Sequence, residues 1–459
     1  MNREMNRVSD IRICYIGGGS RQWAWSLMSD LALEPALSGT VALYDIDVEA
    51  AEANAIIGNR LHEQDGRWRY QVARTLSEGL NNADFVVISI LPGTLEEMEV
   101  DVHRPEKYGI YQAVGDTVGP GGLIRAMRTL PMYDVIARAI RERCPRAWVV
   151  NYTNPMTLCV SYLYRVFPEI RAFGCCHEVF GTQRIMARML QDHFGDGRTI
   201  AREEIRTNVL GVNHFTWINE ASYQGEDILP LYRKFCEAYR EAGYVAGAQE
   251  GADKYFVCDN RVKFDLFLRY GVVAAAGDRH LAEFLPPWYL KSPEEARRWG
   301  FELTPVRYRR ENYKTREATS RALVHGETPF PLKPSGEEGV RQIKALVGLG
   351  DLATNVNLPN AGQASGLPLG AVVETNVLFF QNGIRPLHAG KLPEPVNALV
   401  YRHVANQRAM IEATVRHDQE MTFNAFLNDP LVNLSRDDAR SLFLEMIEGT
   451  RGYLEWWMR

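Results

Sequence analysis

Short apolar runs alternate with amphipathic stretches over residues 1–200. The runs have the length of strands, and the stretches between them repeat apolar residues at helical spacing. Strands separated by helices of this length form right-handed crossovers, so the pattern predicts an α/β fold with a Rossmann-type, doubly wound parallel sheet. We expect strands at 12–19, 41–47, 70–75, 85–91, 147–152 and 171–176. We expect helices at 20–33, 48–64, 123–144, 156–167 and 180–194.

The pattern changes after residue 200. Residues 205–217 and 220–223 are typical of mixed or antiparallel strands, and helices then dominate. Two more strands are expected at 355–358 and 371–380, and two helices at 395–416 and 436–457. We therefore predict a Rossmann-like domain over 1–200 and a mixed α+β substrate and oligomerisation domain over 201–459. The aromatic tail GYLEWWMR is expected to pack on the body or on another subunit.

Composition excludes several classes of protein. With 459 residues, 46% hydrophobic and 24% charged, the chain is expected to be globular and to form two or three lobes. Its net charge of -5 gives no basic field for nucleic acid, and no long apolar run suits a membrane. Seven scattered cysteines and the lack of a signal-peptide pattern suit reduced thiols in the cytoplasm.

A glycine cluster marks a candidate dinucleotide site. Gly17, Gly18, Gly19 and Ser20 end the first strand and open a helix, where backbone amides bind a pyrophosphate. The third glycine of G-x-G-x-x-G is missing, but Asp45 ends the next strand. A carboxylate there accepts hydrogen bonds from both ribose hydroxyls and repels a 2′-phosphate, which favours NAD over NADP.

Polar residues follow three later strand-like runs. Residues 151–156 (NYTNPM), 175–179 (CCHEV) and 211–214 (GVNH) bring a thiol, imidazoles and amides to strand ends, where ligands bind in such sheets. These groups suit a divalent transition metal. Each one taken alone is equally typical of a buried hydrophobic cysteine or a structural histidine.

Seven segments, in order along nearly the whole chain, resemble glycoside hydrolase family four. They are 17–20 (GGGS), 115–122 (GDTVGPGG), 151–156 (NYTNPM), 176–179 (CHEV), 211–214 (GVNH), 357–360 (NLPN) and 373–375 (VET). The resemblance implies a fold related to lactate and malate dehydrogenases, with bound NAD and a divalent metal, usually Mn²⁺. It implies Cys176 and His214 as metal ligands, and Asn154 and His177 as sugar contacts. The Cys-His-Glu-Val form resembles the α-galacturonidase branch.

The resemblance also implies a reaction. NAD⁺ removes hydride from sugar C3, which acidifies the proton on C2. The metal stabilises the enediolate, a base removes the C2 proton, and the C1 substituent leaves by elimination. Water then adds at C1 and NADH returns hydride to C3. This family is an exception to the two-carboxylate mechanism of glycosidases.

The sequence leaves more than one candidate for the base that removes the C2 proton and for the acid that protonates the leaving group. Asp265 is the expected catalytic base, with Tyr270 second; the alternative is that Asp265 merely pairs with Arg261 or Arg269 on a helix face. His177 and a metal-bound water are the candidates for the leaving-group acid. His280 is expected to contact the sugar or to be structural.

A uronide substrate needs a cation for its carboxylate. Arg261, Arg269 and Arg279 are the candidates from the sequence. The leading hypothesis is therefore an NAD- and metal-dependent α-galacturonidase that acts as a homodimer or homotetramer. The alternatives are an α-glucosidase or α-galactosidase of the same family, a 2-hydroxyacid dehydrogenase of the related fold, or an NAD-binding sensor.

Overall fold

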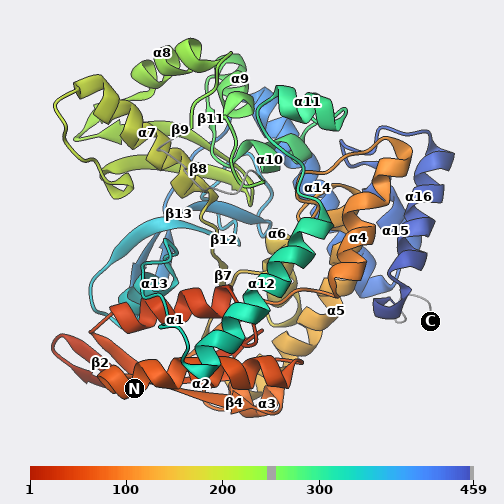
Figure 1. Ribbon diagram of the computed structural model, residues 1–459. Coiled ribbons are helices and arrows are strands. Elements are labelled where there is room, and N and C mark those ends of the chain that lie inside the picture. Colours follow the sequence, from red (N-terminus) through yellow and green to blue (C-terminus); the bar gives the residue numbers. More distant parts are fainter. Residues whose placement is uncertain (246–254, 455–459) are drawn as a thin grey trace.

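The computed structural model describes residues 1–245 and 255–454 and is built on a central ten-stranded sheet (Figure 1). The parallel part of the sheet has the order β4-β3-β2-β5-β6-β7, the strand order of a Rossmann fold. Its strands are β2 (Arg7–Ile16), β3 (Leu37–Tyr44), β4 (Trp68–Ala73), β5 (Phe85–Ile88), β6 (Trp148–Asn151) and β7 (Arg171–Gly174); the short β1 (Asn2–Glu4) pairs with β2. The predicted fold class is confirmed.

Alternation along β2 separates the two faces of the sheet. Ile13 and Tyr15 pack with one group of helices, whereas Cys14 and Ile16 pack with another. Because both sets are buried, helices must cover both faces, as in a doubly wound fold. The first group is α1 (Trp23–Leu33), α2 (Val48–Asp65) and α13 (Gly339–Leu346); the second includes α3 (Leu76–Leu80), α5 (Gly119–Arg143) and α6 (Met156–Val166).

The second half of the chain extends this same sheet. Strand β12 (Leu352–Pro359) runs antiparallel to β7, with Asn357 opposite Gly174, and β13 (Val372–Phe380) and β14 (Gly383–Pro386) follow. β12 therefore lies beside the carboxyl end of β7, and β13 and β14 continue the sheet from there. The division of the chain at residue 200 stays a prediction.

A smaller antiparallel sheet carries the turn that bears His214. It contains β8 (Ile205–Val212), β9 (Phe215–Tyr223), β10 (Glu226–Asp227) and β11 (Val273–Ala274). Antiparallel strands after residue 200 are thus confirmed, but the strand expected over 205–217 is broken at Asn213 and His214, where the chain turns back on itself. Helices α7 (Glu178–Phe194), α8 (Leu229–Tyr239) and α9 (Arg261–Tyr270) pack against it, and α10 (Asp278–Leu281) follows β11.

The remaining helices lie mostly on the side of α5 (Figure 1). They are α4 (Leu95–His103), α11 (Pro293–Arg298), α12 (Val306–His325), α14 (Glu394–Arg416), α15 (Gln419–Leu427) and α16 (Arg436–Gly449). The expected helix over 436–457 was too long: it ends at Gly449, where the Thr450 hydroxyl donates to the carbonyl of Met446 at 3.0 Å. Residues 455–459 of the aromatic tail lie outside the described residues.

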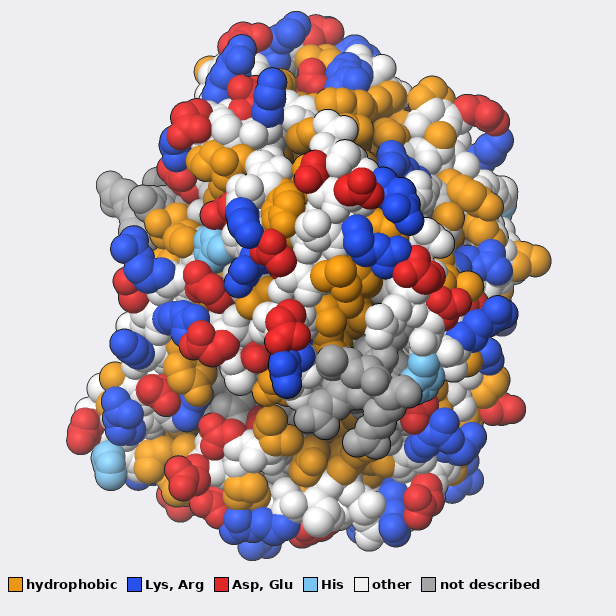
Figure 2. All heavy atoms as spheres, turned by 90° about the vertical axis from the view of Figure 1, so that its right-hand side faces the viewer, with side chains coloured by type: hydrophobic (Ala, Val, Ile, Leu, Met, Phe, Trp, Pro, Cys, Tyr) orange, Lys and Arg blue, Asp and Glu red, His pale blue; other side chains and the backbone are white. Residues whose placement is uncertain are grey.

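Acidic and basic side chains are interspersed over the face that Figure 2 shows. This agrees with the nearly balanced numbers of Lys and Arg (52) and of Asp and Glu (57). Among the described residues, no helix combines the length and the apolar character needed to cross a membrane.

Candidate active site

The glycine turn after β2 lies closely against its neighbours. Gly17 has φ +93°, and a Cβ there would stand 2.0 Å from the carbonyl oxygen of Ser89. A Cβ on Gly19 would stand 2.9 Å from a carboxylate oxygen of Asp45. The sequence uses glycine at these positions because no side chain fits, and the open backbone leaves room for a phosphate group.

Asp45 faces this turn from the end of β3. One carboxylate oxygen accepts from the amide of Gly19 at 2.8 Å, and the other accepts from the amide of Asp47 at 2.9 Å. Partial burial raises the pKa of Asp45, although these two hydrogen bonds act in the opposite direction. The structure therefore brings together the predicted cofactor residues, at the place where a ribose would follow the pyrophosphate.

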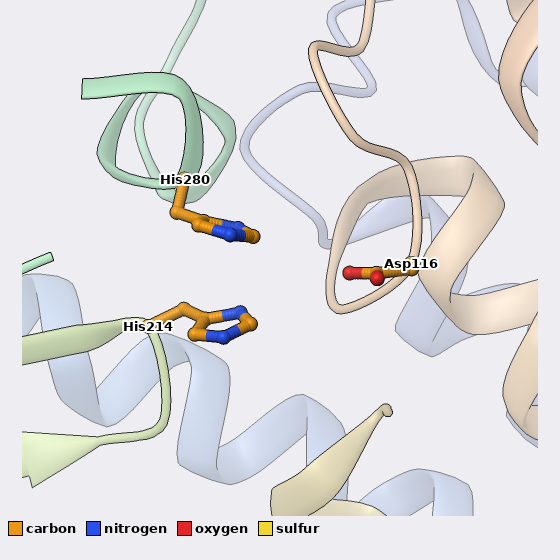
Figure 3. A group of neighbouring side chains, drawn as sticks. All are labelled: Asp116, His214 and His280. Atoms are coloured by element: carbon orange, nitrogen blue, oxygen red, sulfur yellow. The ribbon is translucent and has the colours of Figure 1, made fainter. Parts of the chain in front are cut away.

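A second group of side chains converges from three distant segments (Figure 3). Asp116 lies in the loop before α5, His214 in the turn between β8 and β9, and His280 on α10. Their ligand atoms all lie within 4.8 Å of one another, and the two imidazole rings stack with centroids 3.8 Å apart. His214 has φ +63°, an uncommon backbone conformation for a non-glycine residue and typical of functional sites.

Hydrogen bonds set the tautomer of His214. The Thr117 hydroxyl lies 2.9 Å from His214 Nδ1 and 2.7 Å from a carboxylate oxygen of Asp116. Since ionised Asp116 can only accept, the hydroxyl donates to it and accepts from Nδ1–H. The lone pair of His214 then lies on Nε2, which is free to bind a cation.

The charges around these imidazoles also favour a cation. Burial, and then the neighbouring His280, lower the pKa of His214 to about 3, so its ring is neutral. Burial alone would raise the pKa of Asp116, but Arg125 and the two histidines lower it to about 2. Glu178 is likewise held well below its usual pKa by His280, His177 and His214, against its burial. Two carboxylates that are ionised at neutral pH, beside imidazoles that can offer a nitrogen lone pair, fit a divalent metal ion.

Cys176 is buried and interacts with Asn213, the residue before His214, but it is not part of the group of Asp116, His214 and His280. Its thiol is within hydrogen-bonding reach of Asn213, and burial together with the carboxylates of Glu374 and Glu178 raises its pKa. Glu374 is buried and accepts from Asn213 at 3.4 Å and from Asn357 at 3.1 Å. This network fixes the turn beside the thiol. A bound cation is what would favour the thiolate here.

His177 is held by a carboxylate that the sequence did not reveal. Its Nδ1 lies 2.6 Å from Glu337, and its ring stacks on Trp23, which opens α1 after the glycine turn. Burial acts to lower the pKa of His177, but the hydrogen bond with Glu337 raises it to about 9. His177 thus lies between the dinucleotide turn and the group around His214.

The sequence matches the Family 4 glycosyl hydrolase over residues 12–192, and the Family 4 glycosyl hydrolase C-terminal domain over residues 209–432. The chain belongs to glycosyl hydrolase family 4. It is 60% identical over 456 residues to an alpha-galacturonidase of Thermoanaerobacterium saccharolyticum, which covers 98% of each chain.

Solved structures of this family share the fold. The crystal structure of lplD from Bacillus subtilis is 52% identical, with a TM-score of 0.92 over 96% of this chain and 100% of that one. A 6-phospho-alpha-glucosidase from gut microorganisms, crystallised with NAD and Mn²⁺, is 21% identical with a TM-score of 0.82 over 97% and 99% of the two chains.

In this family 4 glycosyl hydrolase, two other predicted site residues, Asp265 and Asn154, form hydrogen bonds within the chain. Asp265 accepts from the hydroxyl of Tyr289 at 2.6 Å and pairs with Arg269 at 3.3 Å, the structural arrangement foreseen as the alternative to catalysis. The side chain of Asn154 accepts from the amide of Met156 at 3.2 Å. Their assignments as base and as sugar contact stay predictions.

Sequence reasoning missed Asp116, Glu337 and Glu374, and left the role of His280 open. Asp116 and Glu374 lie inside quoted family segments, GDTVGPGG and VET, so their position in a motif was a usable signal. Glu337 lies in no such segment and meets His177 only through the fold.

Proposed function

We propose that this glycosidase hydrolyses α-galacturonides, with NAD and a divalent metal, Mn²⁺ first among them, as cofactors. The substrate assignment rests on the 60% sequence identity, over nearly the whole chain, to an alpha-galacturonidase. The cofactors are supported by the glycine turn with Asp45 and by the carboxylates and imidazoles around His214.

Bound NAD would supply the hydride acceptor and donor, and the metal would act as a Lewis acid on the sugar. Cys176 and His214 hold the metal in this proposal, with Asp116 and His280 beside His214. Thr117 keeps the lone pair of His214 on Nε2.

His177 is proposed to contact the sugar and to protonate the leaving group. Its fixed orientation on Glu337, between the dinucleotide turn and His214, supports this role. Asn154 is proposed as a second sugar contact.

Asp265 is the proposed acceptor of the C2 proton, and Asp116 competes for that role because it faces the imidazoles. Exchange of the C2 proton of the sugar with D₂O shows which of the two aspartates accepts this proton. Asp265→Asn should abolish exchange and leave Mn²⁺ affinity unchanged. Loss of exchange in Asp116→Asn alone, with exchange kept in Asp265→Asn, would transfer the role to Asp116.

A panel of 4-nitrophenyl glycosides tests the substrate. The α-galacturonide, α-glucuronide, α-galactoside and α-glucoside are compared with NAD⁺, Mn²⁺ and a thiol reductant present. The proposal predicts the highest kcat/KM for the α-galacturonide. A preference for a neutral α-glycoside would instead favour the α-galactosidase or α-glucosidase alternative. Stoichiometric NADH formation would favour a dehydrogenase, which the family match already disfavours.

A homodimer or homotetramer in the cytoplasm completes the proposal. Seven free cysteines, of which only Cys258 is not buried, support a reducing compartment. Light scattering after size-exclusion chromatography tests the oligomeric state.

A further inference from the structure

Arg309 is a cation without a hydrogen-bond or ion-pair partner among the residues that the structure describes. It lies in the first turn of α12, and its Nε is buried without a hydrogen-bond acceptor. Over residues 1–245 and 255–454 its guanidinium forms no ion pair or hydrogen bond. The next residue, Arg310, instead pairs with Glu96 and Glu99 of α4. The residue as a whole is half-buried, but an Nε–H that is buried without an acceptor is costly, so its retention indicates an anionic ligand.

The start of α12 is anchored on the loop that carries Asp116. The amide of Thr304 donates to the carbonyl of Ala113 at 3.1 Å, and Arg279 donates to the same carbonyl at 3.4 Å. The amide of Val306 lies 3.1 Å from His103 Nε2 on α4. These bonds fix the first turn of α12 between α4 and α10, where Figure 1 shows it. Arg309 is therefore presented beside the group around His214.

The anions near Arg309 are engaged elsewhere. Asp116 accepts from Thr117, and Glu283 accepts from the amides of Val114 at 2.7 Å and Gly115 at 2.9 Å. Burial lowers the pKa of Arg309, and its charged neighbours include Asp116 and Glu283 but also Arg279. Among the described residues, neither of these carboxylates forms an ion pair with Arg309.

The arginines that the sequence singled out are already occupied. Arg261 donates to the carbonyls of Arg240 and Arg298, Arg269 pairs with Asp265, and Arg279 donates to Ala113 and Thr304. None of them offers a guanidinium as free of protein contacts as that of Arg309.

We propose that Arg309 binds the C6 carboxylate of the uronide, and so determines specificity for uronides over neutral sugars. This inference rests on the proposed function. The carboxylate is attached to C5, across the ring from C2 and C3, so its receptor must lie beside the metal-binding side chains and not among them. The first turn of α12 meets this requirement, and a guanidinium can bind a carboxylate through two parallel hydrogen bonds.

The test compares kcat/KM for 4-nitrophenyl α-galacturonide and α-galactoside in Arg309→Met, Arg309→Lys and the control Arg310→Met. Competitive inhibition by galacturonate is measured alongside, together with NAD affinity. Arg309→Met should lose about 100-fold on the uronide and in galacturonate affinity, with galactoside turnover and NAD affinity little changed. Arg309→Lys should lose about tenfold, because it keeps the charge without the bidentate geometry. Arg310→Met should match the wild type.

An unchanged uronide preference in Arg309→Met would overturn the inference, and so would an equal loss on both substrates. If Arg309→Met does not fold, the ratio of kcat/KM for the α-galacturonide to kcat/KM for the α-galactoside in Arg309→Lys tests the inference instead. Failure of the proposed function is distinguishable, since the wild-type enzyme would then neither cleave the uronide nor bind galacturonate.

Discussion

His214 owes its chemistry to its immediate neighbours. The chain of hydrogen bonds from Nδ1 through Thr117 to Asp116 fixes one tautomer, and burial keeps the ring neutral. The thiol of Cys176 interacts with Asn213, the residue before His214. Cys176 and His214 are therefore the side chains whose loss should weaken metal binding.

Cys176→Ser and His214→Ala should each lower Mn²⁺ affinity by about 100-fold or more, since loss of a group that only supports a ligand costs about 10- to 100-fold. Titration calorimetry with Mn²⁺ measures this directly. Cys175→Ser is the matched control, because the neighbouring buried thiol donates to Gln342 instead and should leave affinity unchanged. Equal Mn²⁺ affinity in Cys176→Ser and the wild type would remove Cys176 from the site.

Asp45→Ala should weaken NAD binding and reduce the ratio of the affinity for NAD to the affinity for NADP. The reason is loss of the ribose hydrogen bonds and of the repulsion against a 2′-phosphate. Asp47→Ala is the control, since Asp47 caps α2 through the amide of Ala50 and should affect stability only. Calorimetric titration of both nucleotides gives the two affinities. An unchanged ratio in Asp45→Ala would mean that its carboxylate does not face the ribose.

At the scale of elements, α14 buries a histidine behind the turn that carries His214. His403 packs on the rings of Phe215 and Phe284, and its Nε2 lies 2.7 Å from the carbonyl of Phe284. Burial lowers its pKa from 6.5 to about 4. The packing of this helix therefore depends on a neutral imidazole.

The free energy of unfolding should fall as the pH drops from about 6.5 to about 4. In that range the unfolded chain protonates His403 while the folded chain does not, which removes up to about 3 kcal/mol. His403→Gln should flatten this part of the stability profile, whereas substitution of the exposed His388 by Gln should not. Denaturant unfolding at a series of pH values measures both. An identical slope for His403→Gln and the wild type would contradict the assignment.

The elements were predictable where local pattern decides them. Most of the strand-helix alternation up to α7 followed from periodicity, but the short helices α3 and α4 were not predicted. The turn at Gly17 followed from the glycine spacing, and Asp45 followed from its position at the end of the next strand. The end of α16 at Gly449 was missed, because apolar residues continue beyond it and only the hydrogen bond from Thr450 marks the break.

The whole molecule supplies what no local pattern holds. Asp116, His214 and His280 meet because the Rossmann-type sheet, the hairpin of β8 and β9, and α10 pack together. The pairing of His177 with Glu337 and the unpaired state of Arg309 likewise depend on segments distant in sequence. Burial and partner choice are properties of the fold, so these residues became visible only in three dimensions.

The dinucleotide turn and the metal-binding group are proposed to act on one sugar, so that hydrolysis proceeds through oxidation and elimination. Proton NMR of the sugar that the enzyme releases in D₂O, with NAD⁺ and Mn²⁺ present, tests this pathway. We expect deuterium at C2 of the product, because the C2 proton is removed in each turnover. A two-carboxylate glycosidase never breaks that bond. A full C2 proton signal after confirmed turnover would contradict the proposed pathway.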